Sequence, residues 1–155
     1  MEAPPLPPGA SRLEAGDYDL LDRARRASER AWAPLSHLHV GAAVRWAGES
    51  GEFVGCNVED LSQAGTVHAE QAALAGAILN RTSTSTSTAR LLTHVAVFAF
   101  EAKTNRVASA SPCGACRQLL LQFNPEARVL FTVGDDVVDS RLTELLPHPF
   151  ELPRT

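Results

Sequence analysis

The sequence predicts an α/β protein in which helices cover the faces of a mixed sheet. The expected elements run helix, hairpin, helix, strand, helix, strand, helix, and strands separated by helices favour such a sheet. The stretch from Thr93 to Phe100 is almost wholly apolar, which is typical of a central strand buried on both faces. The chain has 155 residues, 45% of them hydrophobic, which suits one domain with a full core.

The first helix is expected to start at Asp17 as its N-cap and to run to about Ala33, because Pro34 ends it. Its apolar residues recur at spacings of three and four and form one face: Leu20, Leu21, Ala24, Ala27 and Ala31. Residues 1–15 are rich in proline and follow neither a helix nor a strand period. We therefore expect a flexible arm over 1–15 and a single domain over 16–155.

The middle of the chain predicts a hairpin and a second helix. Residues 40–46 and 52–57 are the expected strands, with a turn at 48–51, and a polar loop follows over 58–66. Residues 68–80 form an alanine-rich helix that is poor in charge after Glu70, so we expect it to be buried on several sides. The Ser/Thr run over 82–88 is expected to be a surface loop.

After the apolar strand, a short strand is expected near Val107 and a helix from Cys113 to about Phe123, before Asn124-Pro125. Residues 128–133 form another expected strand. Ser140 is expected to cap a short helix that ends at Leu145.

Composition excludes several classes of protein. The net charge is −4 with no long basic run, which argues against a nucleic-acid partner. No apolar run approaches the roughly 20 residues of a membrane span, and the N-terminus lacks a signal pattern. Three cysteines, two of them spaced C-x-x-C, favour metal or redox chemistry in a reducing compartment. We expect a cytoplasmic protein.

Two short motifs, His68-Ala69-Glu70 and Pro112-Cys113-Gly114-Ala115-Cys116, each lie at an expected helix start. Cys113 and Cys116, three apart, share one helix face, and the helix dipole in the first turn is expected to lower both thiol pKa values. With His68 they supply three ligands for Zn²⁺, which leaves the fourth position open for water, as in catalytic zinc sites. Glu70 is then placed to carry a proton.

Each motif alone has ordinary explanations. A single histidine is usually a surface or core residue, and a single C-x-x-C also suits a redox dithiol or half of a structural zinc site. The joint occurrence is more specific, because a redox pair has no use for His68 or Glu70, and a structural site needs a fourth ligand. H-x-E followed by P-C-x-x-C is the signature of zinc-dependent base deaminases.

With these motifs the chain resembles the cytidine deaminase family from about Asp17 to Phe150. The resembling segments are Ala33-Pro34-Leu35-Ser36 through Val40-Gly41-Ala42-Ala43, Gly55-Cys56-Asn57-Val58-Glu59, Thr66-Val67-His68-Ala69-Glu70-Gln71, and Ser111-Pro112-Cys113-Gly114-Ala115-Cys116-Arg117-Gln118. The resemblance implies a three-layer α-β-α fold with a mixed five-stranded sheet. It also implies a zinc-dependent hydrolase that converts cytidine or deoxycytidine to the uridine and ammonia. In that reaction a zinc-bound hydroxide attacks C4 and Glu70 shuttles the proton.

The same resemblance implies substrate contacts. Asn57 and Glu59 match positions that hold the ribose hydroxyls, although from the residues alone they are typical of a turn. The Ala69 backbone matches a contact to the pyrimidine oxygen. Phe150 matches an aromatic that lines the base pocket, often in a neighbouring subunit. Leu38 stands where the family often has Phe, which leaves open an antibiotic or modified substrate, such as blasticidin S or an N4-substituted cytidine.

One departure concerns the family branch. Short members often have Cys in place of His68, followed shortly by Arg, whereas this chain has Gln71 after Glu70. The His ligand resembles a long, dimeric branch, yet the chain has single-domain length. The resemblance implies a homo-oligomer, with a tetramer favoured over a dimer, and a role in pyrimidine salvage.

Three other functions stay open: a tRNA or free-base deaminase, a non-catalytic zinc-binding module and a dithiol redox protein. The first commonly shows Glu-Pro-Cys, whereas Ser111 precedes Pro112 here. The sequence does not rank cytidine against deoxycytidine.

Overall fold

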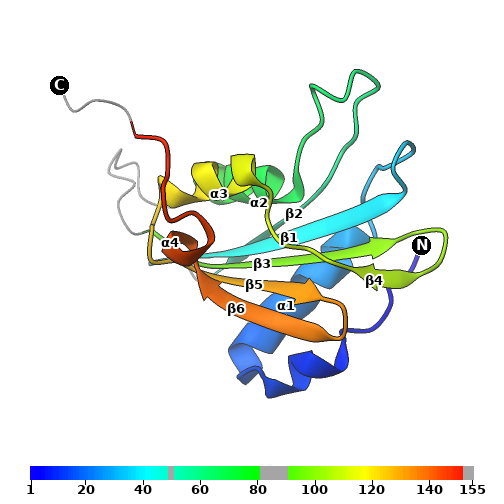
Figure 1. Cartoon of the computed structure of the whole chain (residues 1–155), viewed down its shortest axis with the longest axis horizontal. Helices are drawn as coiled ribbons and strands as arrows, with labels where there is room; N and C mark the ends of the chain where they lie inside the picture. The colour runs from blue at the N-terminus through cyan, green and yellow to red at the C-terminus, as the bar shows by residue number, and fades with distance from the viewer. Residues whose placement is uncertain (49–50, 81–90, 152–155) are drawn as a thin grey trace.

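A mixed β-sheet lies between two layers of helices in the computed structural model, which describes residues 1–48, 51–80 and 91–151 (Figure 1). The sheet follows the order β2-β1-β3-β5-β6, and β4 pairs with β3. The strands are β1 (Leu38–Trp46), β2 (Glu52–Cys56), β3 (Leu92–Glu101), β4 (Arg106–Ala108), β5 (Arg128–Val133) and β6 (Asp136–Arg141). Only the β3–β5 pair is parallel among these strands, so the predicted mixed sheet and its central apolar strand are confirmed.

The helices are α1 (Ala15–Ser28), α2 (Ala69–Asn80), α3 (Gly114–Leu121), α4 (Leu142–Leu145) and the 3-10 helix η1 (Pro8–Arg12). In Figure 1, α2 and α3 lie above the sheet and α1 lies below it. Each layer has its own apolar cluster: Ala73, Leu74 and Leu120 belong to one, and Leu20, Leu21 and Phe98 to the other. The predicted three-layer α-β-α arrangement is confirmed.

A glycine on each face allows a helix to approach the sheet closely. At Gly41 in β1, a Cβ atom would collide with the backbone of Ala24 and Ser28 in α1. At Gly55 in β2, it would collide with the backbone of Ala69 and Ala73 in α2. The first turn of α2, which carries Ala69 and Glu70 directly after His68, is therefore held against the sheet.

Two element predictions are wrong. Helix α1 starts at Ala15, with Glu14 as its N-cap, and ends at Ser28 instead of near Ala33. Asp17 does not cap it, because Asp17 is buried in the first turn and pairs with Arg128. Residues 136–141 form β6, and the N-cap of α4 is Arg141 instead of Ser140. The acidic residues of β6 hid its strand character, since aspartate is rare in strands.

The proline-rich arm lies against the body of the protein. Ala3 and Ala10 are buried in the cluster below the sheet. Ala3 also exchanges hydrogen bonds with α1: its N–H donates to Glu29 Oε1, and its carbonyl accepts from Arg25 Nη1, both at 3.3 Å. The division into an arm over 1–15 and a domain over 16–155 stays a prediction.

Other expectations concern residues or properties beyond these elements. The Ser/Thr run over 82–88 lies outside the described residues. Within the described ranges, none of the helices combines the length and the apolar character that a bilayer crossing requires. The cytoplasmic location stays a prediction.

Candidate active site

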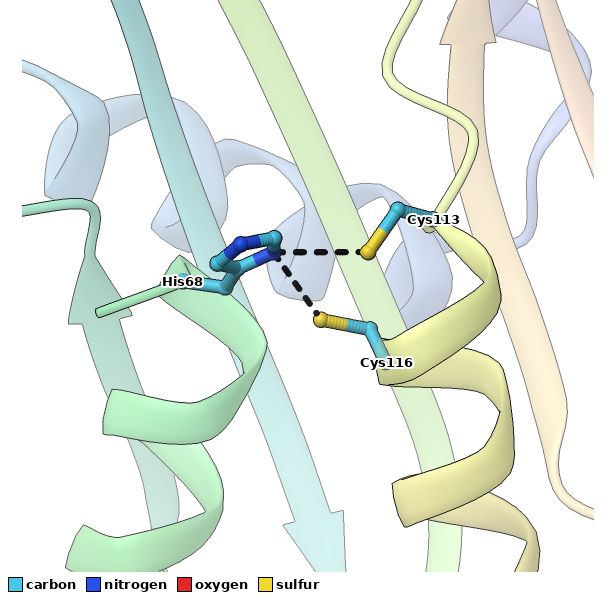
Figure 2. A group of neighbouring side chains, drawn as sticks. All are labelled: His68, Cys113 and Cys116. Atoms are coloured by element: carbon cyan, nitrogen blue, oxygen red, sulfur yellow. Dashed lines mark hydrogen bonds between the residues drawn. The ribbon is translucent and has the colours of Figure 1, made fainter. Parts of the chain in front are cut away.

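The two motifs meet above the sheet at the starts of α2 and α3. His68 directly precedes α2, Cys113 is the N-cap of α3, and Cys116 lies in its first turn. His68 Nδ1 is 3.4 Å from the Sγ atoms of both Cys113 and Cys116, as Figure 2 shows. The three ligand atoms all lie within 4.8 Å of one another. The fold therefore brings together the three predicted ligands.

This geometry fits Zn²⁺. Tetrahedral bonds of usual length separate a nitrogen from a sulfur ligand by about 3.6 Å, close to the observed 3.4 Å. Burial raises the pKa of the Cys116 thiol, and the neighbouring Glu70 and Cys113 raise it further, so the predicted lowering is wrong for Cys116. The helix-terminal amides do not outweigh burial beside two acidic groups. A cation bound at this site would reverse that balance and hold the sulfur as thiolate.

Glu70 lies in the first turn of α2, is 4% exposed, and its charge is among the causes that raise the pKa of the Cys116 thiol. Two residues after His68 in the chain, it reaches the same ligand cluster from the same helix. A carboxyl group buried there is placed to exchange a proton with a group bound at the metal.

A cavity of about 260 Å³ opens beside the ligand cluster. Seven of the nine predicted site residues line it: Leu38, Asn57, Glu59, His68, Ala69, Glu70 and Cys113. Cys116 lies beside them in the ligand cluster. The fold thus gathers residues from β1, from the loop after β2 and from the starts of α2 and α3. Phe150 is not among the lining residues, and it is 72% exposed.

Asn57 is 8% exposed and continues the pairing between β2 and β1 through its side chain. Its Oδ1 accepts from the Val40 N–H at 2.8 Å, and its Nδ2 donates to the Leu38 carbonyl at 2.9 Å. One acceptor position and one N–H of the amide are left over. Asn57 therefore fixes the wall that carries Leu38 and still has capacity for a hydroxyl group in the cavity.

Glu59 is anchored at the rim by the turn before β1. Its carboxylate accepts from the Leu35 N–H at 2.8 Å and from the Ser36 N–H at 3.3 Å. The Ser36 hydroxyl first, and then these amides, hold the pKa of the Glu59 carboxyl below its usual range. Glu59 is thus a fixed anion at neutral pH.

Sequence reasoning did not identify the residues that support the ligands. The Gln71 side chain accepts from the His68 N–H at 2.9 Å. Arg117 donates from Nε to the Pro112 carbonyl at 2.7 Å, and so fixes the backbone just before Cys113. This hydrogen bond between His68 and Gln71 is half of a capping box, in which His68 is the N-cap and Gln71 lies three residues later. That spacing is visible in the sequence and could have predicted the contact.

Comparison with known proteins agrees with this site. A family described as "Cytidine and deoxycytidylate deaminase zinc-binding region" matches residues 15–132. The cytidine deaminase of Sporosarcina psychrophila is 31% identical over 133 residues, covering 84% of this chain and 88% of the relative. The longer cytidine deaminase of Shewanella pealeana is also 31% identical, over 91% of this chain but 41% of the relative.

Solved structures show the same fold. The cytidine deaminase of Burkholderia pseudomallei superposes with a TM-score of 0.72 at 30% identity, covering 89% of this chain and all of that one. The enzyme of Mycobacterium tuberculosis gives a TM-score of 0.69 at 28% identity, covering 90% of this chain and 100% of that one. With the His68, Cys113 and Cys116 cluster in place, this chain belongs to the zinc-binding cytidine deaminase family of enzymes.

Proposed function

We propose that the protein hydrolyses cytidine or deoxycytidine to the corresponding uridine and ammonia, with zinc bound by His68, Cys113 and Cys116. One observation carries the proposal: the ligand cluster, the buried Glu70 and two groups suited to a sugar, Asn57 and Glu59, border one cavity.

Bound zinc supplies a Lewis acid that lowers the pKa of a coordinated water to near 7. In this proposal Glu70 takes a proton from the attacking water and delivers it to N3 of the ring. It then takes the proton of the new C4 hydroxyl and delivers it to the amino group, which leaves as ammonia while the C4 carbonyl forms. In the same proposal the Ala69 N–H, at the start of α2, donates to the pyrimidine oxygen. Overall, one water adds at C4 and one ammonia leaves.

The charge of the cavity supports a nucleoside over a nucleotide. Neither lysine nor arginine occurs among the described residues that line it, and Glu59 stays ionised at its rim. A phosphate group would meet a carboxylate without a compensating cation. The hydroxyls of a free sugar, in contrast, match the remaining capacity of Asn57 and Glu59.

Phe150 belongs to the proposal as a residue acting between copies of the chain. The residue is 72% exposed and is not among those that line the cavity of its own chain, which supports insertion of its ring into the cavity of a neighbouring copy. A homo-oligomer, with a tetramer favoured over a dimer, is part of the same proposal, as is a role in pyrimidine salvage.

An ultraviolet absorbance assay with zinc-loaded protein tests the function. We expect turnover of cytidine, deoxycytidine or both, and none of deoxycytidine monophosphate, cytosine or adenosine. Blasticidin S and an N4-methylated cytidine belong in the panel, because Leu38 widens the range of fitting substrates. Preferred turnover of the monophosphate, or of cytosine without its sugar, contradicts the proposal. Bound zinc without turnover of any substrate favours the non-catalytic module.

A further inference from the structure

The segment after α4, residues 146–151, is tied at both ends to the helix that carries Cys116. At one end, Arg117 Nη1 donates to the Leu145 carbonyl at 2.7 Å. The same guanidinium donates from Nη2 to Ser111 Oγ at 2.8 Å, and Ser111 lines the cavity. The start of the segment is thereby joined to the wall of the active site.

At the other end, the next residue of α3 holds Phe150 by its backbone. The Phe150 N–H donates to Gln118 Oε1 at 2.8 Å, and Gln118 Nε2 donates to the Phe150 carbonyl at 3.0 Å. One amide side chain thus satisfies both backbone groups of a single residue, as a neighbouring strand would. These two bonds fix the position and direction of the chain at Phe150.

The residues between the two anchors are stiff. Pro147 and Pro149 have φ angles set by their rings, so few backbone rotations are left between Leu145 and Phe150. Phe150 is 72% exposed, so packing against its own chain contributes little to holding the residue. The two hydrogen bonds from Gln118 fix the backbone at the point from which the ring projects, which reduces the entropy lost when the ring contacts another molecule.

We infer that Gln118 is a positioning residue, which fixes Phe150 so that its ring can complete a substrate pocket. The inference rests on the proposed function, in which Phe150 contacts the base. Gln118 does not touch the substrate in this account. It acts on substrate affinity through Phe150, while the zinc ligands and Glu70 perform the chemistry.

Gln118→Ala removes both clamping bonds and leaves α3 with a good helix former. We expect the KM for the nucleoside to rise about tenfold, in line with the loss of two hydrogen bonds, with kcat changed less than about twofold. Zinc content should equal that of the unmodified protein. Gln122→Ala, at an exposed position near the end of the same helix, is the matched control and should leave KM unchanged.

A double-mutant comparison links the effect to the ring. If Gln118 acts through Phe150, Gln118→Ala should add little to the KM of Phe150→Ala. Equal additive effects of the two changes, or a fall in kcat with loss of zinc, overturn the inference, because Gln118 would then act on the metal site itself.

Amide hydrogen exchange provides a readout that needs no activity. The Phe150 N–H should be protected in the unmodified holoprotein and lose protection in Gln118→Ala, with the amides of α3 unchanged. If the Phe150 N–H keeps its protection from exchange in Gln118→Ala, the inference that Gln118 fixes Phe150 is overturned. If the unmodified protein turns over no nucleoside, the proposed function fails, and this measurement alone still decides whether Gln118 fixes Phe150.

Discussion

The two faces of the sheet use buried charge in opposite ways. Below the sheet, Asp17 is buried in α1 and pairs with Arg128 at 2.8 Å, and Arg45 pairs with Glu52 at 2.7 Å. Above the sheet, Glu70 is as deeply buried but lies against a thiol instead of a cation. The lower face pairs its charges within the chain, whereas the upper face keeps a carboxyl group beside three metal ligands.

This contrast separates structural from functional charge. A buried carboxylate whose partner cation lies in the same chain holds elements together: Asp17 in α1 pairs with the partly exposed Arg128 in β5. A buried acid whose neighbours are metal ligands indicates a site that is completed by something bound. Changes on the upper face should therefore act on metal and turnover, and changes on the lower face on stability.

The largest effect is expected from His68→Ala. It removes one of three ligands, so zinc content should drop well below one per chain and turnover should fall more than about a hundredfold. His94→Gln, below the sheet, is the matched control and should retain both. Metal analysis and initial rates measure the two outcomes. Equal zinc content in the two variants would remove His68 from the ligand set.

The glycines beneath the two helices offer a paired test of position. Gly55→Ala pushes the first turn of α2 off the sheet, so it should lower kcat about tenfold, because small displacements of reacting groups are costly. Gly41→Ala pushes α1 away instead. It should cost about 2 kcal/mol of unfolding free energy with nearly normal kcat. Equal loss of kcat in both variants would contradict the division between the faces.

Asp17→Asn tests the lower face. It removes a buried charge from Arg128 and should lower the melting temperature by about 6 °C, since about 2 kcal/mol is lost, with kcat unchanged. Asp136→Asn, which breaks the exposed pair with Arg12, is the control and should shift the melting temperature by less than about 2 °C. Similar shifts of the melting temperature in the two variants would show that the buried Asp17 contributes no more to stability than an exposed ion pair does.

The smallest effect concerns His94. Burial first, and then Arg45 and Arg128, lower its pKa, against the opposing charges of Asp17 and Asp139. As pH falls, the unfolded chain binds a proton at about 6.5, before the folded protein does, so stability is lost below that pH. Urea unfolding at pH 7.5 and 5.5 should show a smaller loss in His94→Gln. The loss of unfolding free energy should differ between the two proteins by at most about 1.4 kcal/mol per pH unit. Identical losses in the two proteins would contradict this role of His94.

Sequence alone predicted the upper face better than the lower one. The proposed zinc ligands and Glu70 lie in two short motifs, and the spacing of the residues within each motif predicted the candidate site. The apolar run of β3 identified the centre of the sheet. The sequence around Asp17 predicts a helix cap, because its partner Arg128 is distant in the chain and pairing of that kind leaves no local pattern. The same reason hid Gln118, whose contacts with Phe150 span 32 residues.

Glu70→Gln tests the central claim most directly, because it removes the proton carrier and keeps the size of the side chain. The account predicts zinc content equal to that of the unmodified protein, an unchanged melting temperature within about 2 °C, and nucleoside turnover lowered by at least about a hundredfold. Near-normal turnover with zinc bound would contradict the assignment of Glu70 and the hydrolytic mechanism built on it.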